Sequence, residues 1–344
     1  MSYPLLTFTD KGIYCPLGGF YIDPWRRVEK AVITHAHADH SRWGMDHYLA
    51  HHDSAPVMRL RLGQGISLQT IGYEEPIDIN GVRVSLHPAG HIVGSAQVRV
   101  EQAGEVWVVS GDYKIEDDGL ATAFEPVRCH SFITESTFGL PVYKWAPQAE
   151  IMADINEWWR GNAEKGVASL ITAYSLGKAQ RILQGVDASI GPIYTHGAVE
   201  NTNEVLRRHG IRLQATTQIR RETTKAELRN ALVIAPPNAA NSNWVKRLAP
   251  FSLGMASGWM QLRGARRRRA ADRGFVLSDH ADWDGLNQAV FATGAEQVFV
   301  THGYSEIYSK YLREKGLDAK VVKTEFEGEV LEGVEKNQDQ PKID

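Results

Sequence analysis

Three histidines and one aspartate lie within six positions of one short stretch of the chain. They are His35, His37, Asp39 and His40, and they follow residues 30–34, whose apolar pattern predicts a short buried strand. In an extended segment His35 and His37 point the same way and can share one cation, whereas Asp39 and His40 can reach a second one. Imidazole and carboxylate ligands without thiolates suit Zn²⁺ or Mn²⁺ in an open catalytic site. The alternative interpretation is a solvated, histidine-rich loop.

Further acids and histidines follow apolar, strand-like segments elsewhere in the chain. These residues are His91, Asp112, Glu135, His280 and His302. Metal sites and active sites gather where strands end, so we expect these side chains to meet the first group. The two oxygens of Asp112 could bridge two cations about 3.5–4 Å apart, as two-metal hydrolases require. Taken alone, His91 could equally be a core histidine.

Asp23 stands at the end of another apolar segment, directly before Pro24. A carboxylate at that position can hydrogen-bond a ligand histidine from outside the metal site and fix its tautomer. The alternative role is capping of a turn before proline. Both interpretations remain open from the sequence.

Length and composition indicate an ordinary globular protein. The chain has 344 residues, 43% of them hydrophobic, a net charge of −3 and only two cysteines, Cys15 and Cys129. Two isolated cysteines cannot form a disulfide framework. The first residues show neither the basic region nor the apolar run of a secretory signal, and no stretch of about 18 apolar residues occurs. We therefore expect a cytoplasmic protein without membrane contact.

The pattern of apolar and polar residues changes near residue 141. From there strand-like and helix-like segments alternate, which predicts a parallel α/β sheet. After about residue 274 the first pattern returns, because 274–280 and 297–303 again read as apolar strands that end in histidine. The middle section is therefore predicted to be a small α/β domain inserted into the first one. The polar tail from 333 is predicted to be disordered.

A cluster of positive charge lies just before the second half of the outer domain. Six arginines fall between positions 263 and 273 in a chain that is otherwise mildly acidic, and they are Arg263, Arg266, Arg267, Arg268, Arg269 and Arg273. A local cationic patch favours a polyanionic partner such as nucleic acid. The alternative is a solvated helix face.

Taken in order, these segments resemble the metal-site motifs of the metallo-β-lactamase fold and of its β-CASP nuclease branch. The matching stretches are 34–40, 90–91, 111–112, 134–137, 278–282 and 301–303, and 174–181 resembles the segment that opens the β-CASP insertion. The resemblance covers roughly residues 5–330. It implies an αββα sandwich with an inserted α/β domain. The implied parts are 1–140 and 275–332 for the metallo-β-lactamase domain, 141–274 for the insertion and 333–344 for the tail.

The resemblance also implies a role for each site residue. His35, His37 and His91 would hold one divalent ion, Asp39, His40 and His302 the other, with Asp112 as the bridge; Zn²⁺ is the expected metal and Mn²⁺ the alternative. His280 would protonate the leaving oxygen, and Glu135 would orient the ring of His280. Asp39 completes the catalytic group. Asp23 keeps its supporting role. Lys178, Arg263 and Arg266–Arg269 would contact phosphates beside the cleft.

Within the β-CASP branch the chain is similar to bacterial exonucleases encoded beside an ATP-dependent DNA ligase and a helicase. This similarity implies a DNA-repair exonuclease that acts on single-stranded DNA or DNA ends through a two-metal-activated hydroxide, in functional association with those two enzymes. The histidine at position 302 favours the alternative, an RNA-processing nuclease. A small-molecule ester or thioester hydrolase would have no use for the insertion, Glu135 or His280. A non-catalytic scaffold would not need the intact ligand set.

Overall fold

The structure is a computed structural model, and it describes residues 4–248, 250–262 and 271–326. Three sheets organise these residues. The first sheet has the strand order β1-β2-β3-β4-β5-β6. Its strands are β1 (Thr7–Phe8), β2 (Ile13–Cys15), β3 (Phe20–Ile22), β4 (Lys30–Val32), β5 (His47–His51) and β6 (Leu68–Ile71). From β3 onward all neighbours are parallel, so the segments after β3, β4 and β5 leave the sheet at one edge.

The second sheet has the order β19-β18-β11-β10-β9-β8-β7. Its strands are β7 (Ile77–Ile79), β8 (Val82–Pro88), β9 (Ala96–Gln102), β10 (Glu105–Val109), β11 (Ser131–Ser136), β18 (Gln297–Gly303) and β19 (Asp318–Val321). β10, β11, β18 and β19 run parallel to one another, and the pairing of β18 with β11 joins the second half of the chain to the first. Parallel pairing brings the carboxyl ends of β10, β11 and β18 to the same edge of the sheet.

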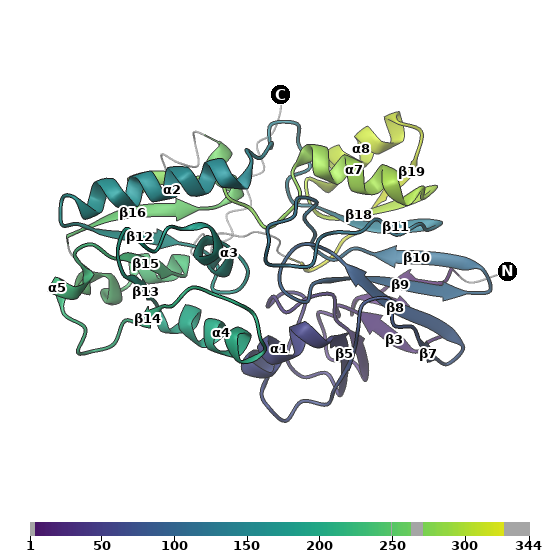
Figure 1. Ribbon diagram of the computed structural model, residues 1–344. Helices are drawn as coiled ribbons and strands as arrows, with labels where there is room; N and C mark the ends of the chain where they lie inside the picture. Colours follow the sequence, from purple (N-terminus) through teal and green to yellow (C-terminus); the bar gives the residue numbers. More distant parts are fainter. Residues whose placement is uncertain (1–3, 249, 263–270, 327–344) are drawn as a thin grey trace.

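These two sheets pack face to face and carry helices on their outer faces (Figure 1). One continuous apolar cluster contains Ile13, Phe20 and Val32 of the first sheet and Val84 and Val98 of the second. The helix α1 (Ala55–Leu62) packs on the outer face of the first sheet. The helices α7 (Trp283–Thr293) and α8 (Ser305–Glu314) pack on the outer face of the second. The order of layers is therefore helix, sheet, sheet, helix.

The third sheet is entirely parallel, with the order β14-β13-β15-β12-β16-β17. Its strands are β12 (Ala168–Thr172), β13 (Ile193–Thr195), β14 (Thr217–Gln218), β15 (Leu232–Ala235), β16 (Phe251–Ala256) and β17 (Arg273–Phe275). Helices and loops cover both of its faces, so β12 and β15 are buried at every position, as the apolar runs of their sequences require.

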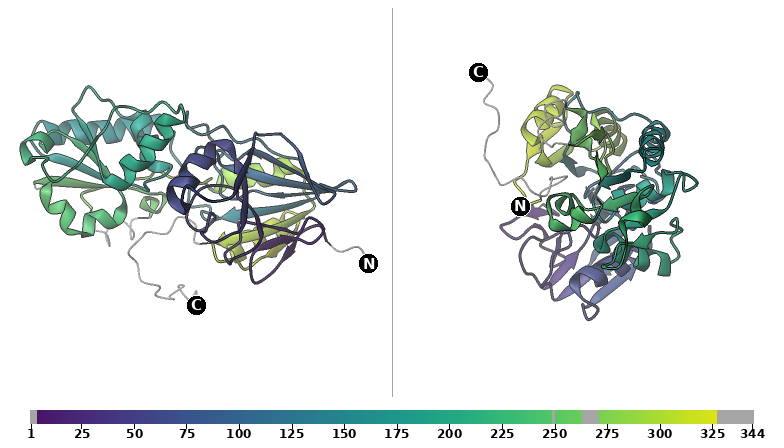
Figure 2. Two further views of the ribbon diagram at one scale, coloured as in Figure 1. Left: turned by 90° about the horizontal axis from the view of Figure 1, so that it is seen from below. Right: turned by 90° about the vertical axis from the view of Figure 1, so that its left-hand side faces the viewer.

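Helices α2 (Gln148–Ala163) and α3 (Lys178–Gly185) share an apolar cluster on one face of this sheet, and α5 (Lys225–Leu228) lies in the cluster on the other. The helix α4 (Gly197–Arg208) reaches from this part toward α1. The remaining short helices are η1 (His52–Ser54), η2 (Pro237–Asn241), η3 (Asn243–Arg247) and η4 (Gly258–Gln261). Figure 2 shows the third sheet and its helices as a body beside the two packed sheets.

The mixed α/β class predicted from the sequence is confirmed, and one predicted strand is wrong. The apolar run 274–280 predicts a strand that begins the second half of the outer domain. Instead only Arg273–Phe275 forms a strand, and it pairs with β16 in the third sheet. Residues 276–280 leave the strand conformation and carry His280 toward the second sheet.

The two cysteines are buried and form no disulfide with each other. Among the residues described here, no helix is both long and apolar enough to cross a membrane.

Two glycines with the same backbone angle give a test of how tightly the end of β18 is packed. Gly303 and Gly316 both have a φ of 92°. A Cβ at Gly303 would lie 2.2 Å from the backbone oxygen of Ser136, whereas a Cβ at Gly316 meets nothing within 4 Å. We expect Gly316→Ala to lower the free energy of unfolding by about 1–2 kcal/mol through φ strain alone. Gly303→Ala should cost about 1–3 kcal/mol more, because backbone must move.

Urea denaturation of the two variants and the wild type measures this difference. Equal losses in the two variants would show that the segment after β18 tolerates displacement.

Candidate metal centre

The loop that carries three of the histidines is fixed by a buried carboxylate. Asp23 is 1% exposed and follows β3 with a positive φ of 43°. Its Oδ1 accepts the backbone N–H of Thr34 at 2.8 Å, and its Oδ2 accepts the Thr34 hydroxyl at 2.5 Å. The ring of His40 donates from Nδ1 to the same Oδ2 at 2.7 Å. Asp23 thus connects the start of the loop, directly after β4, to its far end.

Asp112 reaches this loop from the second sheet because the intervening residue is glycine. Gly111 has a φ of 57°, and a Cβ there would lie 2.6 Å from the hydroxyl oxygen of Thr34. Only glycine allows the chain after β10 to approach the first sheet so closely. The carboxylate of Asp112 is consequently buried between the two sheets, at 2% exposure.

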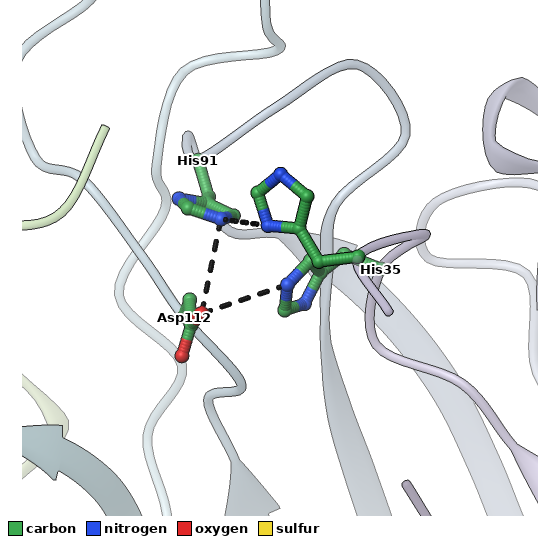
Figure 3. A group of neighbouring side chains, drawn as sticks. His35, His91 and Asp112 are labelled. Carbon is green, nitrogen blue, oxygen red and sulfur yellow. Dashed lines mark hydrogen bonds and ion pairs between the residues drawn. The ribbon is translucent and has the colours of Figure 1, made fainter. Parts of the chain in front are cut away.

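One oxygen of Asp112 faces a first group of imidazoles. His35 Nε2 lies 3.6 Å from Asp112 Oδ2, and His91 Nε2 lies 3.8 Å from it (Figure 3). His37 completes this group, with Nδ1 3.0 Å from His91 Nε2. Ligand atoms of the four residues all lie within 4.8 Å of one another, so a single cation can contact all of them.

The other oxygen of Asp112 faces a second group. His302 Nε2 lies 3.2 Å from Asp112 Oδ1, and His40 Nε2 lies 3.5 Å from it. Asp39 Oδ2 lies 3.6 Å from His40 Nε2 at the rim of this group. The two oxygens of one carboxylate therefore face two separate sets of histidines.

Threonine hydroxyls hold the outer nitrogens of two of these rings. Since the hydroxyl of Thr34 donates to a carboxylate, its oxygen accepts from His35 Nδ1 at 3.0 Å. The hydroxyl of Thr301 donates to the backbone carbonyl of Thr134, and its oxygen accepts from His302 Nδ1 at 3.2 Å. Both rings therefore carry their proton on the outer nitrogen and present a lone pair to Asp112.

Backbone carbonyls fix two more rings in the same way. His91 donates from Nδ1 to the carbonyl of Asp279 at 2.7 Å, and His37 donates from Nε2 to the carbonyl of Leu176 at 3.2 Å. The inner nitrogens of His37 and His91 are then two lone pairs that face each other at 3.0 Å. Such an arrangement is repulsive unless a cation lies between the two nitrogens.

Several inner atoms of the centre are buried and form no hydrogen bond. They are His35 Nε2, His40 Nε2, His302 Nε2 and Asp112 Oδ1. Buried polar atoms in proteins are almost always paired, so this set needs another partner. Burial lowers the pKa values of His35, His37 and His91, which favours the neutral imidazole that binds metal ions. The donor set, its tautomers and its unpaired atoms all fit divalent cations.

Beside the first group lies a histidine–carboxylate pair. Glu135, near the end of β11, accepts from His280 Nδ1 at 2.9 Å through Oε2 and from the backbone N–H of Tyr113 at 2.9 Å through Oε1. Ligand atoms of Asp112, Glu135 and His280 lie within 4.8 Å of one another. The rings of His91 and His280 are 4.8 Å apart. His280 is thus held at the edge of the metal centre by a carboxylate on its Nδ1.

Of the cations predicted to bind phosphates, Lys178 is the one that lies among the described residues. Lys178 is only 1% exposed, and its ammonium lies 5.0 Å from the centre of the Tyr174 ring. The first residue of α3 therefore packs into the interior, and the phosphate contact of Lys178 stays a prediction. Arg263 and Arg266–Arg269 lie outside the described residues.

Several contacts of the centre were not anticipated from the sequence. The backbone carbonyl of Asp279 carries no sequence signal, and neither does Phe326, whose ring stacks on His40 at 4.4 Å. A signal did exist for the two threonines. In both cases a threonine stands directly before a histidine, at Thr34–His35 and at Thr301–His302.

The chain is similar in sequence to several known proteins. No protein-family model matches the chain. A probable DNA ligase of Opitutus terrae is 31% identical over 310 residues, which are 90% of this chain and 30% of that protein. The endoribonuclease YSH1 of Saccharomyces cerevisiae is 29% identical over 122 residues, 35% of this chain and 15% of that protein. Cleavage and polyadenylation specificity factor 73 of Drosophila melanogaster is 26% identical over 165 residues, which are 46% of this chain and 24% of that protein.

The chain therefore spans less than a third of the length of each of these relatives. A solved structure, a protein of unknown function from Enterococcus faecalis, has a TM-score of 0.55 at 11% identity and covers 79% of this chain and 74% of its own. That likeness concerns the fold alone. The relatives of the chain thus include YSH1 and the cleavage factor, which are β-CASP members of the metallo-β-lactamase family.

Replacing Asp23 by asparagine tests the support of the ligand loop. Asparagine keeps the shape but offers one oxygen where three donors need two, so one buried donor loses its acceptor. The free energy of unfolding of the chelator-treated protein should fall by about 1–3 kcal/mol. Zinc affinity should fall about 10–100-fold, because the tautomer of His40 is no longer fixed.

Chemical denaturation and zinc titration provide these two measurements, with the exposed Asp10→Asn as the matched control. Unchanged zinc affinity in Asp23→Asn would show that the ring of His40 is oriented by other contacts.

Proposed function

We propose that the protein is a metal-dependent phosphodiesterase with the αββα sandwich of the metallo-β-lactamase fold. The sandwich would comprise residues 1–140 and 275–332, and 141–274 would be the β-CASP insertion. The layer order of the first two sheets and the separate parallel sheet support this division. β17 ends at Phe275, within a residue of the proposed boundary.

The observation that carries the proposal is the pair of imidazole groups on the two oxygens of Asp112. We assign His35, His37 and His91 to one cation, and Asp39, His40 and His302 to the other. Asp112 is the bridge. Zinc suits this nitrogen-rich set, and Mn²⁺ is the alternative. The buried inner nitrogens without a hydrogen-bond partner support bound cations, since the rings of His35, His91 and His302 already donate outward.

The protein's own residues can divide the work of hydrolysis as follows. Two divalent cations, when bound, supply the Lewis acidity that activates water and neutralises charge developing on phosphorus. Asp112 and the ligand histidines would hold the cations, and they therefore determine where the charge that develops on phosphorus is neutralised. Glu135 holds Nδ1 of His280, so Nε2 is the nitrogen that can give a proton to the leaving oxygen. Buried at 1% exposure and held by the Tyr113 amide, Glu135 cannot turn away.

We propose DNA as the substrate and exonucleolytic repair as the role. Support comes from the match that spans 90% of this chain, since that relative is named a probable DNA ligase. That relative contains a segment similar to nearly the whole of this chain, which suggests that processing of DNA ends and ligation act together. An ATP-dependent ligase and a helicase are accordingly the proposed partners. The proposed location is the cytoplasm.

RNA processing is the second candidate, and a specific observation favours it. The relatives named endoribonuclease match the chain, although over only about a third of its length. His302 also takes part in the second imidazole group. A ligand histidine changes how a cation is held but does not itself recognise a 2′-hydroxyl. The extent of the match therefore favours DNA over RNA.

The arginine run remains a proposed contact for the nucleic-acid backbone. Arg263 and Arg266–Arg269 concentrate positive charge in a chain of net charge −3. Arginines that neutralise phosphates release counterions, so binding weakens as salt increases. For Lys178 a phosphate contact would require a conformation in which α3 exposes its first residue.

Asp112→Asn should lower the occupancy of both cations at once. The amide keeps the shape but removes the charge that both imidazole groups face. Metal content after dialysis, measured by plasma mass spectrometry, should fall well below that of Asp117→Asn, an exposed aspartate nearby. Full content of both metals in Asp112→Asn would contradict the bridging role.

His280→Ala should leave metal content unchanged and slow cleavage by about 10²–10⁴-fold, the usual effect of losing a general acid. Glu135→Gln should slow it less, because the ring remains in place. The exposed His47→Ala is the control. Wild-type rates in His280→Ala at neutral pH would remove this residue from the reaction.

The decisive experiment compares one single-stranded sequence made as DNA and as RNA, labelled at either end, with added Zn²⁺ or Mn²⁺. Wild type, Asp39→Ala and the exposed control Asp46→Ala are tested together. Mononucleotide release from DNA by wild type and Asp46→Ala, lost in Asp39→Ala, supports the proposed exonuclease. Cleavage confined to RNA supports the second candidate. Hydrolysis of simple esters without nucleic-acid cleavage would overturn both.

A further inference from the structure

A buried arginine lies behind the metal centre, on the side of the third sheet. Arg181 belongs to α3 and is 3% exposed. In Figure 1, α3 lies on the side of the third sheet that faces the packed pair of sheets. A buried guanidinium requires close partners, because an unpaired charge in the interior is costly. The partners of Arg181 come both from the helices of the third sheet and from the loops of the packed pair.

One guanidinium nitrogen holds the segment that connects β17 to α7. Arg181 Nη1 donates to the backbone carbonyl of Ser278 and to Oδ1 of Asp279, the second contact at 3.2 Å. A guanidinium presents its donors in a rigid planar fork, so contacts with two neighbouring residues restrict the orientation of the peptide that joins them. Arg181 therefore fixes the peptide between Ser278 and Asp279.

The other side of the guanidinium is fixed as well. Its Nε donates to Oε1 of Gln148, the first residue of α2, and lies 3.9 Å from Oδ2 of Asp118 in a loop after β10. Gln148 also donates to the backbone carbonyl of Asp118 at 3.0 Å. Arg181 thus cannot move without breaking contacts in both parts of the molecule.

The peptide that Arg181 fixes leads directly to two residues of the candidate site. The backbone carbonyl of Asp279 accepts from Nδ1 of His91 at 2.7 Å. The next residue is His280, whose backbone N–H donates to the hydroxyl of Ser278 at 3.1 Å. A displacement of residues 278 and 279 would therefore turn the ring of His91 and shift His280 at the same time.

The start of α3 contacts the first imidazole group directly. The backbone carbonyl of Leu176 accepts from Nε2 of His37 at 3.2 Å. Gly177 has a φ of 90°, and a Cβ there would lie 2.5 Å from Cγ2 of Ile92, the residue after His91. The positions of His37 and His91 therefore both depend on how α3 is placed.

We propose that Arg181 is a positioning residue for His91 and His280, acting through the peptide of Ser278 and Asp279. Groups that orient a ligand from outside the metal site typically change metal affinity about 10–100-fold when they are lost. The proposed insertion would then complete the first half of the metal centre through α3. The effect on catalysis rests on the proposed function, whereas the effect on zinc affinity can be measured without a substrate.

Zinc affinity and hydrogen exchange test the positioning role in the absence of nucleic acid. Arg181→Met keeps an unbranched side chain but removes the donors, and Arg208→Met, at an exposed position of α4, is the matched control. Competition with a chromogenic chelator should show zinc affinity about 10-fold or more below wild type in Arg181→Met and unchanged in Arg208→Met. In chelator-treated Arg181→Met, residues 278–282 should exchange faster, with a smaller change in β15.

An ion pair with a purely structural role would give a different result. It would lower the stability of Arg181→Met but leave the zinc affinity of the folded protein unchanged. Wild-type zinc affinity in folded Arg181→Met would therefore overturn the proposal.

A second variant decides the question if Arg181→Met does not fold. Asp279→Ala removes the carboxylate that Nη1 contacts and leaves the backbone carbonyl that holds His91. We expect a smaller but measurable loss of zinc affinity, because the contact of Arg181 with the carbonyl of Ser278 remains. In this case wild-type zinc affinity in Asp279→Ala would overturn the proposal.

Nuclease kinetics at saturating zinc distinguish positioning from substrate binding. Arg181→Met should lower kcat about 10-fold or more with little change in KM, because a displaced His280 affects the reaction step. A raised KM at wild-type kcat would make Arg181 a substrate-binding residue and would overturn the proposal. If the wild type cleaves no nucleic acid, the proposed function fails, and the zinc affinity of Arg181→Met still decides whether Arg181 positions His91.

Discussion

The structure depends on one carboxylate placed where two sheets meet. Asp112 is almost fully buried, and a buried charge is tolerated only with close compensation. Histidines from the first sheet and from β18 surround its two oxygens, and each of those rings is in turn held by a threonine, a carbonyl or Asp23. The close packing of the two sheets therefore depends on the same side chains that form the site.

This constraint explains why small residues stand at the ends of the strands. Gly111 lets Asp112 approach Thr34, and Gly303 lets the chain turn against β11 directly after His302. In both cases a backbone atom or a fixed hydroxyl occupies the space of a side chain. Close approach of the two sheets brings the donors into one site, and metal coordination tolerates errors in ligand distance of only about 0.2 Å.

The sequence predicts the chemistry better than the placement. Ligand types at strand ends could be inferred because apolar runs of β10, β11 and β18 end in acid or histidine. The placement of Lys178 could not be inferred, since a charged first residue of a helix normally faces solvent. Nor could the strand Arg273–Phe275, which is short enough to join either sheet. Contacts through backbone carbonyls, such as that of Asp279 with His91, leave no trace in residue types.

The parallel pairing of β11 with β18 has a consequence during synthesis. Ser131 lies opposite Gln297, and the residues between them include the entire third sheet. At about 5–20 residues per second, a ribosome needs roughly 8–33 s to make the intervening chain. The earlier strands therefore emerge with an open sheet edge beside β11 and without His280 or His302. The third sheet can fold in that interval, and the site closes only when β18 arrives.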